Sequence, residues 1–223
     1  MKKLALIALL MLIQSGFAQD ITKSLGDFST VRVFDQLTVL LVKSDENKIV
    51  ISGHNAEDVE IVQKKSDIKI RMKFTKMLQG DDISITLYYK NIDQIEASEG
   101  SYVSSQDVFK ATAFELNAKE KASIKVNLDV QKLKSKANSG GEIIVGGKAA
   151  NHDASVTSGG ILKARELLTA QTAVNISAGG EAVITASDFV DAGTTAGGTI
   201  DIYGSPKQVN QKNTAGGSIN IKG

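Results

Sequence analysis

The chain has 223 residues, with 26 Lys and Arg side chains against 25 Asp and Glu. This balance leaves no excess of positive charge that would recruit nucleic acid or an anionic membrane, and we expect no nucleic-acid partner. Because the chain has no Cys, its fold must be stabilised by core burial and backbone hydrogen bonds instead of disulfides. A composition with 20 Gly, no Trp and a single Pro suits many short, regular strands.

Residues 1–18 have the pattern of an export signal peptide. Lys2 and Lys3 precede an apolar run, 4–13, that is too short to span a bilayer as a permanent anchor. Ala18 is the expected residue before the cleavage site. The mature chain, 19–223, then holds 24 basic and 25 acidic side chains and no transmembrane anchor. We therefore expect an exported protein that is periplasmic, outer-membrane-associated or extracellular.

The first part of the mature chain, 19–96, alternates apolar and polar residues in short segments. These segments are 31–41, 48–52, 59–62, 68–74 and 83–89. Turn-forming compositions separate them, as in KSDENK (43–48), GHNAED (53–58) and LQGDD (78–82). The alternation predicts an all-β N-terminal half that is less regular than the rest. It leaves open whether these strands form coils continuous with the later ones or a distinct β-layer.

Paired glycines recur through the second part of the chain, 97–223, at intervals of 19, 18, 20 and 19 residues. The pairs are Gly140-Gly141, Gly159-Gly160, Gly179-Gly180, Gly197-Gly198 and Gly216-Gly217. The second residue after each pair is apolar (Ile143, Leu162, Ala182, Ile200 and Ile219), the fourth is apolar too, and the third is mixed. This alternation predicts a strand with one buried face, and the fixed period predicts a solenoid.

Only small residues precede each glycine pair, as in Asn138-Ser139 and Thr157-Ser158. We interpret these positions as corners, where glycine takes a positive φ without steric penalty and lets successive coils approach closely. Coils of about nineteen residues stacked about 4.8 Å apart would pair their strands in parallel around a column of small aliphatic side chains. The predicted fold is therefore a parallel β-helix, whose phase continues upstream through Ala122 and Gly100.

The signal peptide, the opening strands "FSTVRVFDQLTVLLVKSDENKIVISG", the step "IEASEGSYV" and the glycine-pair coils together resemble the putative auto-transporter adhesin head GIN domain family. The resemblance covers residues 25–223. It implies a secreted or envelope β-helical protein of a kind common in Bacteroidetes, with a single GIN-like domain over 19–223. The family carries no catalytic motif that maps onto this sequence.

The chain has two His and no Cys, and we predict no catalytic, cofactor-binding or metal site. The histidines, His54 and His152, are each flanked by Asn or Asp and are predicted to be turn residues. Solvent-facing carboxylates are predicted at Glu142 and Glu181, two coils and about 9.6 Å apart along the axis, and at Asp201. That separation is at the edge of the geometry of inverting glycosidases. We interpret these acids as solvated surface groups.

The favoured interpretation is an exported, non-enzymatic β-solenoid that acts as an adhesin-like or envelope binding or structural module. Its expected partner is a glycan or another envelope protein, and no cofactor is expected. The alternative is a polysaccharide-degrading β-helix hydrolase or lyase. The last strand, 218–222, would leave an open β-edge, which predicts a homodimer through the C-terminal end.

Overall fold

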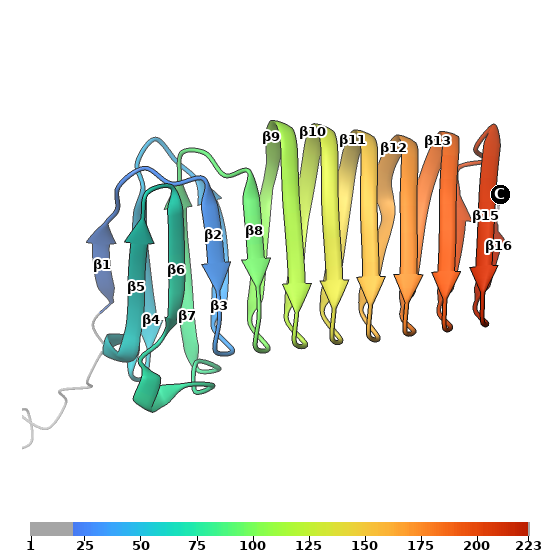
Figure 1. Cartoon of the computed structure of the whole chain (residues 1–223). Coiled ribbons are helices and arrows are strands. Elements are labelled where there is room, and N and C mark those ends of the chain that lie inside the picture. The colour runs from blue at the N-terminus through green and yellow to red at the C-terminus, as the bar shows by residue number, and fades with distance from the viewer. Residues whose placement is uncertain (1–19, 223) are drawn as a thin grey trace, which may run out of the picture.

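A computed structural model describes residues 20–222, and the predicted signal peptide lies outside them. The described residues are nearly all β, with 69% of them in strands and 3% in helices. Within residues 20–222, sixteen strands join in one sheet. The sheet winds into a β-solenoid of about seven turns, whose coils of about 19 residues stack along one axis (Figure 1). The predicted fold class is confirmed.

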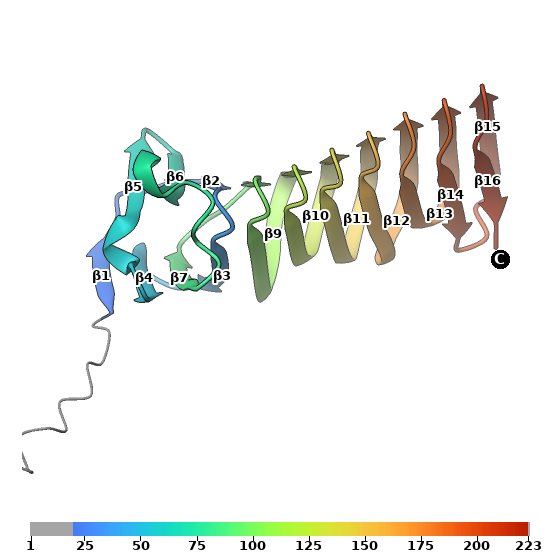
Figure 2. The same ribbon diagram turned by 90° about the horizontal axis from the view of Figure 1, so that it is seen from below.

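Five long strands form the regular part of the solenoid, and each bends around the axis from one corner to the next. They are β9 (Tyr102–Lys119), β10 (Ser123–Asn138), β11 (Glu142–Thr157), β12 (Ile161–Ser177) and β13 (Glu181–Thr195). Each strand pairs in parallel with the next. The chain then continues through β14 (Thr199–Tyr203), β15 (Gln208–Thr214) and β16 (Ser218–Ile221). Figure 2, seen from below, shows the bent outline that successive coils share.

The apolar positions after the glycine pairs stack in register inside the solenoid. Ile143 pairs with Leu162, Leu162 with Ala182, Ala182 with Ile200, and Ile200 with Ile219. The side chains of Ile143, Leu162, Ala182 and Ile200 are buried. Ile219 belongs to the last coil and is only half-buried. The predicted column of small aliphatic side chains is therefore confirmed.

The corners combine a left-handed backbone with close contact between coils. Ser139 and Gly140 have φ values of 49° and 73°, the pattern of a type I′ turn. The second glycine of the pair has a different role, because a Cβ on Gly141 would lie 2.2 Å from the carbonyl oxygen of Ala118 in the preceding coil. The glycine pair thus supplies both the turn and the close approach.

Earlier corners adopt the same backbone without a glycine pair. Glu120 and Lys121, between β9 and β10, have φ values of 55° and 62°. Asp35 and Gln36, with φ values of 59° and 63°, form a corner between β2 (Thr30–Val33) and β3 (Thr38–Lys43). The predicted strand over 31–41 is therefore interrupted by a corner.

The N-terminal strands form coils of the same stack. Strand β2 pairs in parallel with β8 (Gln94–Ala97), and β3 pairs in parallel with the start of β9. On the other side, β2 pairs in parallel with β6 (Asp67–Met72), and β3 with β7 (Ile83–Tyr89). The coil built from β2 and β3 therefore lies between two coils that come later in the chain.

Antiparallel strands close the N-terminal end of the stack. Strand β4 (Lys48–Gly53) pairs with β7, and β5 (Val59–Lys64) pairs with β6, both antiparallel. Strand β1 (Ile21–Ser24) adds to the outside of β4. A 3-10 turn, η1 (Ala56–Asp58), joins β4 to β5, and a second, η2 (Phe74–Lys76), lies in the connection from β6 to β7.

Candidate functional site

The solvent-facing carboxylates lie where the sequence places them, but two of them are engaged by neighbouring side chains. Glu142 and Glu181 share an outward row two coils apart, with Ile161 between them. A carboxylate oxygen of Glu142 lies 2.6 Å from the Lys163 ammonium. The Asp201 carboxylate accepts a hydrogen bond of 2.8 Å from the following coil. Within residues 20–222, no group of three or more His, Cys, Asp and Glu side chains could hold a metal ion.

The two histidines have different environments. His54 is exposed in the turn after β4, as predicted. The prediction for His152 is wrong, because His152 lies in the middle of β11 with its ring inside the solenoid and 3% exposed. Its polar neighbours, Asn151 and Asp153, are the outward residues of the same strand, so their composition reflects strand alternation and not a turn.

The buried ring of His152 forms an internal contact with a serine. Its Nε2 lies 2.7 Å from the Ser135 hydroxyl, whereas Nδ1 has no hydrogen-bond partner among the described residues. Burial lowers the pKa of His152 to about 4. Although a hydroxyl beside an imidazole has the spacing of an activated nucleophile, Ser135 is only 1% exposed and no substrate can reach it. The pair is therefore part of the solenoid interior.

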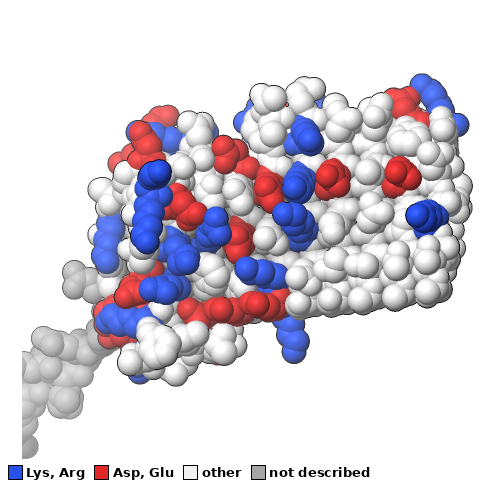
Figure 3. Space-filling model, viewed as in Figure 1, with Lys and Arg blue, Asp and Glu red and all other residues white. Residues whose placement is uncertain are grey.

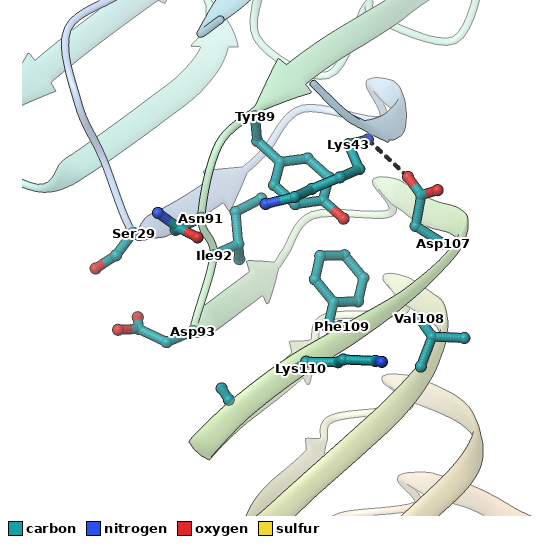
Figure 4. Close-up of a pocket in the computed structure, with 11 residues that line it drawn as sticks. Ser29, Lys43, Tyr89, Asn91, Ile92, Asp93, Asp107, Val108, Phe109 and Lys110 are labelled. Atoms are coloured by element: carbon teal, nitrogen blue, oxygen red, sulfur yellow. Dashed lines mark hydrogen bonds between the residues drawn. The ribbon is translucent and has the colours of Figure 1, made fainter. Parts of the chain in front are cut away.

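One surface hollow, which we call the junction pocket, lies where the N-terminal coils meet β9 (Figure 4). It has a volume of about 430 Å³ and is lined by Lys43, the segment after β7, and residues 107–111 of β9. The backbone N–H of Lys43 donates a hydrogen bond of 2.6 Å to the Asp107 carboxylate. This hydrogen bond ties β3 to the part of β9 where its pairing with β10 shifts register.

The aromatic rings of the junction pocket are packed against each other. Tyr89 and Phe109 stack with ring centroids 5.2 Å apart, and they are 2% and 3% exposed. Burial raises the pKa of Tyr89, and the charge of Asp107 raises it further, so the phenol stays neutral. Because the ring faces are covered, these side chains offer no open platform for a sugar ring. We interpret the pocket as a packed joint between β7 and β9.

A second hollow, which we call the solenoid groove, crosses the outward face of β10–β14. Its volume is about 520 Å³, and its lining includes Lys125, Ile144, Lys163, Arg165, Val183 and Tyr203. Lys125, Ile144, Lys163 and Val183 are consecutive members of one outward row. The guanidinium of Arg165 lies over the Tyr203 ring, with Cζ 4.2 Å from the ring centroid. The groove thus combines an aliphatic floor with cationic sides.

A third surface feature, which we call the polar row, runs along the corner that precedes the glycine pairs. It consists of residues in register on β10, β11, β12, β13 and β15, namely Asn138, Thr157, Ser177, Thr195 and Thr214. Four of them are exposed and Thr157 is half-buried. The Thr157 hydroxyl donates to the Asn138 side-chain oxygen at 2.9 Å. Hydroxyl and amide groups therefore repeat along the axis at the spacing of the coils.

The family model for the putative auto-transporter adhesin head GIN domain matches residues 27–206. The chain belongs to this family. The resemblance seen in the sequence is thereby confirmed. A comparison with curated proteins found no match.

Solved structures share the architecture of this GIN-domain protein. A putative adhesin from Bacteroides fragilis superposes with a TM-score of 0.82 at 17% identity, covering 91% of this chain and 97% of that one. A putative lipid binding protein from Parabacteroides distasonis gives a TM-score of 0.68 at 16% identity, covering 93% and 98%. A putative adhesin from Parabacteroides merdae gives 0.61 at 16% identity, covering 93% and 98%. At these identities the similarity shows the fold.

The sequence did not reveal the solenoid groove of the GIN domain, although it contained a signal. Ile144 and Val183 occupy the third position after the glycine pair, which otherwise holds charged or polar residues such as Lys163 and Asp201. Aliphatic side chains at an outward position indicate an apolar surface patch. No helix within residues 20–222 is long and apolar enough to cross a membrane.

Proposed function

We propose that this GIN-domain protein is an exported, non-catalytic binding module whose solenoid surface binds a glycan or an envelope protein in the manner of an adhesin. The proposed unit is the mature chain, 19–223, located in the periplasm, at the outer membrane or outside the cell. The names of the family and of its solved relatives support an adhesin-like role.

The observation that carries the proposal is the polar row on a rigid sheet. Its groups repeat about every 4.8 Å because they follow the strand spacing. In Figure 3, charged side chains cluster over the N-terminal coils, and the surface towards the C-terminal coils carries fewer of them. Regularly spaced hydroxyl and amide groups can donate and accept hydrogen bonds, as recognition of sugar hydroxyls requires. A rigid support also reduces the entropy lost when an extended ligand binds.

A glycan array probed with the wild-type protein and two matched variants tests the proposal. Ser177→Lys places a bulky side chain in the polar row, whereas Gln171→Lys introduces a lysine at another exposed position of β12. We expect glycan binding by the wild type, loss of binding in Ser177→Lys and retention in Gln171→Lys. Equal binding by both variants would exclude the polar row as the contact surface.

Product release from polysaccharides tests the alternative of a hydrolase or lyase. Because Lys163 pairs with the Glu142 carboxylate, we expect no reducing ends or unsaturated sugars from a polysaccharide panel with either the wild type or Glu142→Gln. Product that appears with the wild type and disappears with Glu142→Gln would replace the binding proposal with an enzymatic one.

We also propose that the last coil forms a homodimer through its open edge. Among residues 20–222, β15 pairs only with β13 and β16 only with β14. Ile221 of β16 is 53% exposed. A proline-rich extension after Gly223 would block strand addition, so we expect it to halve the mass measured by light scattering. An unchanged mass would exclude edge pairing.

A further inference from the structure

The solenoid groove has an aliphatic floor at positions where a solvent-facing strand normally carries polar residues. Along one outward row, Lys125 pairs with Ile144, Ile144 with Lys163, and Lys163 with Val183. Ile144 and Val183 are half-buried, so each leaves part of its side chain open to solvent. The inward neighbours Val126 and Val145 complete the lining beneath them. A surface of this kind favours contact with an apolar ligand.

Local backbone features deepen this part of the face. Gly146 has no side chain, and a Cβ there would lie 2.6 Å from the Asn127 side-chain oxygen. The pairing of β11 with β12 shifts its register between Ile144 and Gly147, which marks a bulge. Tyr203 forms the far wall, where the Arg165 guanidinium covers its ring. The hollow therefore follows from a missing side chain and an irregular pairing, and it crosses several coils.

The sides of the groove are rich in positive charge. Lys125 and Arg165 border it, and Lys163 stands in the outward row between Ile144 and Val183. Glu166 is the acidic residue in the lining. Lys163 is partly neutralised by Glu142, at 2.6 Å. Within residues 20–222, the ion pairs do not include Lys125 or Arg165. Lys125 thus remains available to an anionic group at one end of the apolar floor.

We propose that the solenoid groove binds a single-chain anionic amphiphile, an alkyl chain that ends in a carboxylate. The chain lies over Ile144 and Val183, and the carboxylate is held by Lys125 at the β10 end of the row. From Lys125 to Val183 the row crosses three strand spacings, or about 14 Å, which gives room for an extended chain. An acidic sugar fits less well, because the floor is aliphatic and the Tyr203 ring face is covered by Arg165.

Isothermal titration with dodecanoate, below its micelle concentration, tests this inference. Dodecyl maltoside, which has the same chain without a charge, measures the contribution of the acid group. Oligogalacturonate, an acidic glycan without an alkyl chain, measures the contribution of charge alone. We expect dodecanoate to bind more tightly than either of the other probes. Tighter binding of oligogalacturonate would overturn the proposal in favour of an acidic-glycan site, and failure of dodecanoate to bind would also overturn it.

Three variants locate the site. Lys125→Gln removes a groove cation. Lys134→Gln removes an exposed lysine of the same strand, β10, that does not line the groove. We expect Lys125→Gln to weaken dodecanoate binding about fivefold and Lys134→Gln to leave it unchanged. Val183→Asp should weaken binding more than tenfold, because it removes floor area and places a charge under the alkyl chain. Equal affinities in Lys125→Gln and Lys134→Gln would refute the proposed site.

Folding controls accompany these measurements. Val183 faces outward, so Val183→Asp should retain the wild-type circular dichroism spectrum. If it does not fold, Val183→Thr keeps the shape of the side chain and should still weaken binding severalfold. The groove and the polar row are different surfaces, so loss of dodecanoate binding leaves the glycan-array result with Ser177→Lys unaffected.

Discussion

Mild acid should destabilise the protein through one buried side chain, His152. The ring sits in the interior, in register with Leu133 on one side and Thr172 on the other. Desolvation by burial is the cause that lowers the pKa of His152 to about 4. Protonation would put an N–H group on both ring nitrogens, and Nδ1 has no hydrogen-bond partner among the described residues. The folded state therefore disfavours the charged ring.

The sign and size of the effect follow from the two protonation equilibria. In the unfolded chain the pKa of His152 returns to its ordinary value of about 6.5, so the unfolded chain binds the proton more readily. Stability is full above pH 6.5 and is lost as the pH falls towards 4. The difference between the folded and unfolded pKa of His152 corresponds to roughly 3 kcal/mol of unfolding free energy. About 2 kcal/mol of this is lost by about pH 5.

Urea unfolding at about pH 7.5 and pH 5, followed by far-ultraviolet circular dichroism, measures this loss. The comparison is a double variant, Ser135→Ala with His152→Leu, which removes both partners of the internal contact. All other titrating groups are shared, so we expect the wild type to lose about 2 kcal/mol more than the double variant. His54→Gln, in an exposed turn, should behave as the wild type. Equal losses in the wild type and the double variant would refute the reasoning.

Two further predictions concern the corners and the core. Gly160→Ala should lower the free energy of unfolding by well over 1 kcal/mol, because its Cβ would lie 2.3 Å from the Ala137 carbonyl oxygen. Gly159→Ala should cost only about 1 kcal/mol, since its position has φ +75° and open space. Thermal unfolding measures the loss of stability in each variant. Equal losses in Gly160→Ala and Gly159→Ala would contradict the roles assigned to the two glycines, close approach and turn. Ile143→Ala, in the buried column, should cost about 3 kcal/mol by urea unfolding. Ile219→Ala, in the half-buried last coil, should cost less than half as much. The reverse order would contradict the described burial.

The regular coils could be predicted from the sequence because two independent signals coincide there. The glycine pairs mark the corners, and Ile143 and its equivalents mark the buried face, so period and alternation agree. The corner at Asp35 and Gln36 was not predicted, because these residues adopt a left-handed backbone that residues other than glycine seldom take. The corner at Glu120 and Lys121 has no glycine pair either, and only the phase that continues through Ala122 indicated it. Their conformation is imposed by the stacked coils and not by local composition.

The surface features were less predictable, because they depend on which residues become neighbours across coils. The pairing of Glu142 with Lys163 follows from their 21-residue separation only once the register of β11 and β12 is known. The prediction of a turn at His152 was wrong because Asn and Asp occur both in turns and at the outward positions of a strand. The solenoid groove required the register shift beside Gly147, which no periodicity reveals.

The position of the β2–β3 coil between two later coils determines how the molecule can assemble. A chain that emerges N-terminus first holds β2 and β3 without parallel partners until residues 67–89 and then 94–105 have followed. Closing those long loops is entropically unfavourable and slow. Each of the strands β10 to β13 can instead pair with the strand before it as soon as it is available. We therefore expect the N-terminal coils to set the folding barrier, and lengthening the stack by whole coils should add little to that barrier.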